Sequence, residues 1–290
     1  MLYSQLGATG LRVSKIGLGC SRLARGKESS GILAAALDLG VNFFDTADSY
    51  GQGESERALA PILKRHRGDV YIASKVGYST TAFGALSGKI RALWSGGGKP
   101  QHFTPRYIQT AVHASLKRLE TDYIDLLQLH SPTLDVARSE AIWTCLLDLQ
   151  VKGHIRSFGI SCRNVHDAVV LAEYAAFPSL QCEINIFQGS GCSGLMSHLA
   201  RGKSGLIARQ AFASGQMGTL REKYRFLEIP GRRSITQAAI QYVLHYRHVS
   251  TLLVGTSSPK HLEENVGALS TPLLSTTETE RIVAMAMGPA

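Results

Sequence analysis

Short apolar runs and longer amphipathic segments alternate along most of the chain. The apolar runs predict strands that are buried on both faces, at residues 14–18, 41–45, 70–75, 124–129, 154–160, 180–184, 205–209 and 251–254. Segments with helical periodicity follow these runs, at residues 29–39, 54–64, 105–119, 135–150, 165–174, 194–200, 234–246 and 259–268. Eight strand–helix units predict an α/β fold, a (β/α)8 or TIM barrel.

The first residues do not fit the strand–helix repeat. Two short apolar segments flank a turn at residues 8–10 and predict a β-hairpin, which we expect to close the bottom of the barrel. A doubly wound sheet is the rival fold, but the first strand lacks a GxGxxG turn. Because the composition shows no break that would mark a linker, we expect one domain over residues 1–290.

The composition narrows the class of protein. Hydrophobic residues make up 44% of the 290 positions and mean hydropathy is near zero, so a globular core is expected. No apolar stretch reaches the length of a membrane span, and the start lacks a basic region followed by an apolar run, so no signal peptide is expected. Five scattered cysteines, with no CxxC spacing, predict a reduced, cytoplasmic protein.

The net charge of +9 is compatible with an anionic partner. The dense basic run at residues 64–67 ends a predicted helix, where cations are favoured, and no aromatic residues interleave with it. A nucleic-acid groove would need such residues. The charge therefore favours an anionic small-molecule cofactor over nucleic acid.

Four residues with catalytic potential stand at or just after the ends of successive strands. Asp45, Lys75 and His130 end the second, third and fourth strands, and Tyr50 follows the second. Adjacent strands are about 4.8 Å apart, so these side chains can meet at one rim. An ammonium beside a phenol favours the phenolate, Asp45 would hold that ammonium, and His130 would orient a substrate oxygen. The set suits protonation of a carbonyl oxygen as hydride arrives at carbon.

Two connections after strands are longer than simple turns. They cover residues 77–103 and 212–233 and would lie at the barrel mouth, where barrel active sites form. The aromatic and glycine content of the first predicts a substrate lid. Candidate walls of the substrate pocket are Cys20, Arg22, Tyr78, Trp94 and Phe103.

Four segments together resemble the signatures of the aldo-keto reductase superfamily: NFFDTADSYGQGESERALAPIL, YIASKVGY, DYIDLLQLHSP and RSFGIS. The resemblance implies a TIM barrel without metal that binds NADPH, or alternatively NADH, in an extended form. It implies Tyr50 as general acid, Lys75 and Asp45 as the residues that tune it, and His130 as the residue that orients the carbonyl. The substrate would be an aldehyde, a ketone or the matching alcohol.

The resemblance also implies cofactor contacts. Ser161 and Gln181 match residues that hold the nicotinamide carboxamide, whereas Cys162 stands where the family often has asparagine. Arg209 replaces an aromatic residue that stacks on nicotinamide in many members, and would lie along the ring or the phosphates.

The segment after the eighth strand predicts an anion site before a helix N-terminus, built from Gly255, Thr256 and Ser257. By resemblance, Glu264 and Asn265 would touch adenine. The arginine that usually binds the 2′-phosphate falls at His261, where Lys260 would substitute, so NADPH is favoured over NADH.

Two other functions remain open at this point. A regulatory subunit on the same fold can retain the four residues, and a barrel lyase or isomerase could use Lys75 as a Schiff-base former. The long substrate loop that the family carries at its C-terminus is largely missing here, so specificity would come from the mouth loops or from a neighbouring subunit. The sequence does not identify the substrate, the physiological direction or the oligomeric state.

Overall fold

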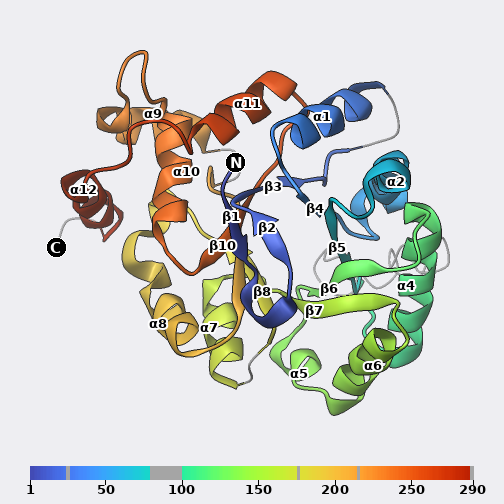
Figure 1. The fold of residues 1–290 in the computed structure, drawn as a ribbon. Helices are drawn as coiled ribbons and strands as arrows, with labels where there is room; N and C mark the ends of the chain where they lie inside the picture. Colours follow the sequence, from blue (N-terminus) through green and yellow to red (C-terminus); the bar gives the residue numbers. More distant parts are fainter. Residues whose placement is uncertain (24–26, 79–99, 175–176, 214–215, 288–290) are drawn as a thin grey trace.

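The computed structural model describes residues 1–23, 27–78, 100–174, 177–213 and 216–287, and its centre is a closed barrel of eight parallel strands (Figure 1). The strands are β3 (Ile16–Gly19), β4 (Phe43–Asp45), β5 (Tyr71–Val76), β6 (Ile124–His130), β7 (Ile155–Ser161), β8 (Ser179–Glu183), β9 (Gly205–Arg209) and β10 (Val249–Val254). Pairing between β10 and β3 closes the barrel. The predicted (β/α)8 barrel is confirmed.

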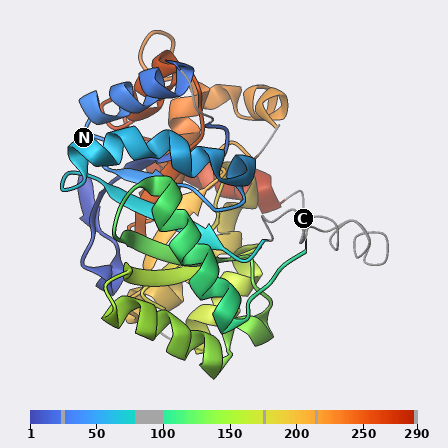
Figure 2. The same cartoon turned by 90° about the vertical axis from the view of Figure 1, so that its right-hand side faces the viewer.

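A ring of helices surrounds the strands (Figures 1 and 2). The longer helices are α1 (Lys27–Asp38), α2 (Glu54–His66), α4 (Pro105–Leu119), α6 (Glu140–Val151), α7 (Val165–Tyr174), α8 (Ser193–Arg201), α10 (Ile235–His245), α11 (Pro259–Gly267) and α12 (Thr276–Met287). The apolar faces of these helices, except α12, cover the outside of strands that are buried on both sides. In the part of the chain that the structure describes, none of the helices combines the length and apolarity needed to cross a membrane.

The N-terminal hairpin closes the bottom of the barrel, as predicted. It consists of β1 (Tyr3–Gln5), a 3-10 turn η1 (Gly7–Thr9) and β2 (Arg12–Ser14), and it lies across the barrel axis in Figure 1. Leu6 and Leu11 pack with Phe43 from inside the barrel in one buried cluster. Gly7 has a φ of +51°, and a Cβ there would lie 2.1 Å from the backbone nitrogen of Gly205, so this close approach requires glycine.

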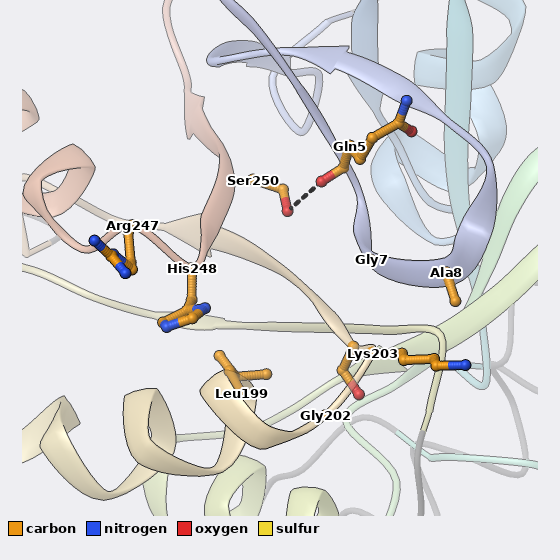
Figure 3. A pocket seen from close by; sticks show the side chains of 10 residues that line it. Gln5, Gly7, Ala8, Leu199, Gly202, Lys203, Arg247, His248 and Ser250 are labelled. Atoms are coloured by element: carbon orange, nitrogen blue, oxygen red, sulfur yellow. Dashed lines mark hydrogen bonds between the residues drawn. The ribbon is translucent and has the colours of Figure 1, made fainter.

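A polar hollow of about 390 Å³ lies on the hairpin side of the barrel, between the hairpin, the end of α8 and residues 247–250 (Figure 3). At its edge the Ser250 hydroxyl donates to the carbonyl of Gln5, at 3.0 Å. None of the predicted catalytic or cofactor residues lines this hollow. The bottom of the barrel is therefore chemically distinct from the mouth.

Three predicted elements differ from the structure. The helix expected at 135–150 is two helices, α5 (Leu134–Ala137) and α6, because Ser139 has an extended backbone between them. The strand expected at 14–18 divides at Lys15, where the chain changes partner from β1 to β4 and β10. The connection at 212–233 contains α9 (Met217–Lys223) and the 3-10 turn η4 (Arg225–Leu227).

Candidate active site

The four predicted catalytic residues lie at one rim of the barrel. Asp45 and His130 are the last residues of β4 and β6, and Lys75 lies next to the end of β5 between them. Tyr50 begins the 3-10 turn η2 (Tyr50–Gly53) after β4. Because parallel strands present their carboxyl ends at the same edge, the sheet brings these side chains together.

Lys75 links the general-acid candidate to its acidic partner. Its ammonium donates to Asp45 Oδ1 at 2.5 Å, to the carbonyl of Thr46 at 2.8 Å and to the Tyr50 hydroxyl at 3.3 Å. Burial alone lowers the pKa of Lys75, but the charge of Asp45 and the bonds to Asp45 and Tyr50 outweigh it, and the pKa is raised. Lys75 therefore remains a cation although only 1% of its surface is exposed.

Asp45 also accepts hydrogen bonds from the cofactor side of the site. Its Oδ2 accepts from Gln181 Nε2 at 2.8 Å and from Gln128 Nε2 at 3.4 Å. Ser161 in turn donates to Gln181 Oε1 at 2.8 Å. A continuous hydrogen-bonded chain thus joins the two predicted carboxamide residues to Asp45, Lys75 and Tyr50. Gln128 was not predicted, although a glutamine within the apolar run DLLQLH was a visible signal.

His130 is held between two aromatic rings. Its ring meets Tyr50 and Tyr78 edge-on, with ring centroids 5.9 and 4.7 Å apart. Gln101 Nε2 donates to the carbonyl of His130 at 2.9 Å. The predicted wall residue Tyr78 therefore does contact the site, and it positions the imidazole.

The other expected pocket walls fall in different places. Arg22 lines the mouth hollow described below, whereas Cys20 is fully buried outside that lining. The Phe103 ring packs directly against Gly77. A Cβ at position 77 would lie 2.5 Å from this ring, so the contact depends on the absence of a side chain there. Trp94 and residues 79–99 of the connection that was predicted to form a lid lie outside the described residues.

A hollow of about 400 Å³ opens at the mouth and is lined by two of the four predicted catalytic residues, Asp45 and Tyr50. Its lining also includes Gly19, Gln181, residues 209–212 and Gly255. Arg209 donates to the carbonyls of Cys162 and Arg163, at 3.0 and 3.3 Å. The two arginines at positions 22 and 209 give the hollow a positive charge that suits a pyrophosphate.

Cys162 does not supply the contact that asparagine gives in the family. Its thiol donates to the carbonyl of Ile160 at 3.9 Å, and burial raises its pKa to about 12. The side chain is 1% exposed and is not part of the lining of the hollow. Of Ser161, Cys162 and Gln181, only Gln181 lines the hollow.

The predicted anion segment leads from β10 into α11. Thr256 Oγ1 accepts from the backbone of Ser258 at 3.1 Å, and Ser258 caps α11. Around the helix, Ser257, Lys260, His261 and Glu264 are exposed, whereas Asn265 is buried. Of all these residues, only Gly255 lines the mouth hollow.

Glu264 borders a second hollow, of about 610 Å³, together with residues of α9, η4 and the start of α10. Its Oε1 accepts from the Ser234 hydroxyl at 2.8 Å. Both hollows lie along the stretches of chain that follow β9 and β10, but no described residue lines both of them.

Asp48 is a buried acid that sequence reasoning missed. It lies between Asp45 and Tyr50 and is 1% exposed, and neither carboxyl oxygen has a hydrogen-bond partner among the described residues. Burial, and then the charge of Glu56, raise its pKa to about 8 against the opposing charge of Arg118. Asp48 is therefore protonated at neutral pH and adds no negative charge beside Lys75.

Comparisons with known proteins agree with this geometry. The model of the Aldo/keto reductase family matches residues 15–286. The uncharacterized oxidoreductase YqkF of Bacillus subtilis is 29% identical, over 97% of this chain and 95% of its own length. The aldo-keto reductase YhdN of the same organism is 29% identical over 78% of this chain and 67% of its own length.

Solved structures extend the likeness to the fold. The holo form of aldo-keto reductase AKR11C1 from Bacillus halodurans superposes with a TM-score of 0.82 at 27% identity, covering 98% of this chain and 96% of its own. The chain therefore belongs to the aldo/keto reductase family and is an oxidoreductase.

Proposed function

We propose that this protein reduces an aldehyde or ketone, or oxidises the matching alcohol, with Tyr50 as the general acid. The observation that carries this proposal is the bond from the buried, charged Lys75 to the Tyr50 hydroxyl, at the floor of the mouth hollow. A phenol at this distance from a fixed ammonium can give up its proton and take it back.

In this proposal each residue has one task. A bound reduced nicotinamide supplies the hydride. Tyr50 donates its proton to the carbonyl oxygen, and the positive charge of Lys75, held by Asp45, stabilises the phenolate that remains. His130, fixed between Tyr50 and Tyr78, orients the same oxygen.

We propose NADPH as the preferred cofactor, with NADH as the weaker alternative. Ser161 and Gln181 would hold the carboxamide, since Gln181 lines the hollow and Ser161 donates to Gln181 Oε1. Arg209, with Gly255, Thr256 and Ser257, would lie along the pyrophosphate. Lys260 and His261 would face the 2′-phosphate, and Glu264 and Asn265 the adenine.

The central experiment combines binding with activity. We expect the purified protein to bind NADPH in a fluorescence titration and to oxidise it with members of a panel of aldehydes and ketones. Tyr50→Phe should bind the dinucleotide with unchanged affinity but lower turnover by several orders of magnitude. Tyr123→Phe, which alters a phenol stacked under Arg67, is the matched control. Full reductase activity in Tyr50→Phe would refute the general-acid assignment.

A second comparison tests the cofactor preference. Lys260→Ala should raise the dissociation constant for NADPH by about tenfold, the value of one charge-assisted contact, and should leave that for NADH nearly unchanged. Equal effects on both cofactors would remove Lys260 from the 2′-phosphate site.

Two other roles are separated by simple outcomes. A regulatory subunit would bind the dinucleotide without turning over any carbonyl in the panel. A lysine imine at Lys75 would be trapped by borohydride in the presence of a carbonyl substrate, whereas hydride transfer leaves no such adduct.

We propose that the protein is cytoplasmic, because its five cysteines are unpaired.

A further inference from the structure

The C-terminal helix α12 lies against two segments that leave the barrel mouth. It packs on η3 (Ile186–Cys192), which follows β8, and on the segment after β9. Ile282 of α12 is fully buried in a cluster with Ile186, Tyr224 and Leu227. Arg281 stacks on Phe226 at 3.8 Å from the ring centroid. The helix therefore packs on two segments that also contact each other, since the Tyr224 hydroxyl donates to the carbonyl of Ile186 at 3.3 Å.

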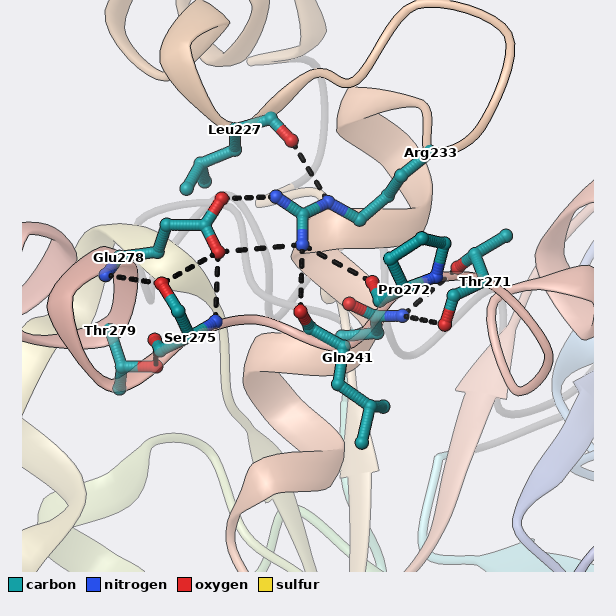
Figure 4. Close-up of polar contacts among 9 residues, drawn as sticks. Leu227, Arg233, Gln241, Thr271, Pro272, Ser275, Glu278 and Thr279 are labelled. Atoms are coloured by element: carbon teal, nitrogen blue, oxygen red, sulfur yellow. Dashed lines mark hydrogen bonds and ion pairs between the residues drawn. The ribbon is translucent and has the colours of Figure 1, made fainter.

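One buried cation fixes this arrangement (Figure 4). The Arg233 guanidinium donates to both carboxylate oxygens of Glu278, near the start of α12. It also donates to the carbonyl of Leu227 at 2.9 Å and to the carbonyls of Pro272 and Leu273 at 3.2 and 3.1 Å. Three stretches of chain thus meet at one side chain.

Arg233 depends on these partners. A buried guanidinium is costly unless its donors are satisfied. Removal of the Glu278 carboxylate therefore destabilises the contacts between Arg233 and its partners, which we call the Arg233 junction. Glu278 is held in turn by Ser275, whose backbone nitrogen and hydroxyl donate to Oε2 at 2.8 and 3.0 Å. The pair therefore orders α12 and the segment after β9 together.

The junction reaches both hollows. Phe212, which lines the mouth hollow, packs against the cluster that contains Tyr224, Leu227 and Ile282. Ser234, the residue after Arg233, donates to Glu264 at the second hollow. A shift at Arg233 would consequently move walls of both hollows.

We propose that Arg233 and Glu278 are positioning residues for the dinucleotide: by fixing the segment after β9, they set how long the cofactor stays bound. This inference rests on the proposed function, because it takes the two hollows as parts of one dinucleotide site. The pair does not touch the catalytic residues, so it should govern cofactor release and leave proton transfer unchanged.

The test measures the release of NADPH by stopped-flow fluorescence. Glu278→Gln keeps the shape of the side chain and removes its charge. We expect release about tenfold faster and a KM for NADPH raised to match, with turnover at saturating NADPH not lowered. An unchanged release rate would overturn the proposal.

Asp125→Asn is the matched control, since Asp125 forms a buried ion pair with Arg67 and Arg156 near the start of β6. It should lower stability without changing the rate of NADPH release. Equal acceleration in both variants would show a general loss of stability and overturn the proposal.

If Glu278→Gln does not fold, Ser275→Ala provides a second test. It removes one side-chain donor to Glu278 and should accelerate NADPH release about threefold; no change would overturn the proposal. A wild-type protein that binds neither NADPH nor NADH would instead refute the proposed function.

Discussion

Among the residues that the structure describes, two cations are almost completely buried, and they have different partners. Lys75 is 1% exposed and Arg233 is 2% exposed, and each is paired with a carboxylate. Besides Asp45, Lys75 donates to the carbonyl of Thr46 and to the Tyr50 hydroxyl, which lines the mouth hollow. The remaining acceptors at Arg233 are backbone carbonyls from two segments.

The difference follows from the chemistry of the two side chains. An ammonium is a compact charge whose pKa responds to its surroundings, so beside a phenol it can tune a proton donor. A guanidinium is always charged and presents five donors in a plane, which suits it to tie several segments together. The partners of a buried cation therefore indicate whether it serves a reaction or the architecture.

The largest expected effect is on turnover and concerns Lys75. Lys75→Met should lower turnover by several orders of magnitude, nearly as much as Tyr50→Phe, because no cation remains to stabilise the phenolate. Steady-state kinetics at saturating NADPH measure this effect. The assignment of different roles to Lys75 and Arg233 would be wrong if Arg233→Met lowered turnover equally while the protein remained folded and saturated with cofactor.

The next effect is on stability. Arg233→Met leaves Glu278 without its cation and should lower the free energy of unfolding by about 3–5 kcal/mol, as measured by urea denaturation. Arg233→Met combined with Glu278→Leu should recover much of this loss, because an apolar pair has no charge to desolvate. If the double variant were as unstable as the single one, lost packing rather than an unpaired charge would be responsible.

A smaller effect is expected in the pH dependence of stability, which should differ between the Lys75–Asp45 pair and the Arg233–Glu278 pair. The pKa of Lys75 is raised above its ordinary 10.5, so its contribution to stability is present below pH 10.5 and is lost as pH rises through the folded-state value. The pKa of Glu278 is lowered from 4.5: burial opposes this shift, but hydrogen bonds from Ser275 and Arg233 outweigh it. Its contribution is therefore present above pH 4.5 and is lost as pH falls.

Urea midpoints across the pH range provide the measurement. Lys75→Met should flatten the alkaline limb of the stability curve, and Glu278→Gln should flatten the acid limb. The assignment of the two pairs to opposite limbs would be wrong if each variant altered both limbs alike.

The smallest expected effect concerns the residue next to Arg233. Ser234 forms a capping box with Gln237 at the start of α10, and Ser234→Ala should cost about 1 kcal/mol. Thermal unfolding measures this cost, with Thr104→Ala at the cap of α4 as a comparison. A much larger loss at Ser234 would show that its bond to Glu264 also supports the junction around Arg233.

The sequence allowed the reactive cation to be predicted because its signal is local. Asp45, Lys75 and His130 are ionisable residues next to the ends of apolar runs, and strand order alone brings them to one rim. The closed barrel followed from the same alternation of strands and helices. Gln128 carried an equally local signal, and only its bond to Asp45 needed the structure.

The burial of Arg233 and its pairing with Glu278 could not be predicted, since the partners are distant in sequence. Glu278 lies 45 positions from Arg233, and no periodic pattern connects them. Asp48 resembles an ordinary loop aspartate, and its burial depends on how the segment after β4 packs. The break at Ser139 was also hidden, because the helical periodicity continues through it while the backbone does not.

The five cysteines have a consequence for the chemistry at the mouth. All are buried and unpaired, and burial raises the pKa of each thiol. Because the thiolate is the nucleophilic form, we expect these thiols to react slowly with electrophiles such as quinones or unsaturated aldehydes. Such resistance would matter if the protein acts on carbonyl compounds, as we propose.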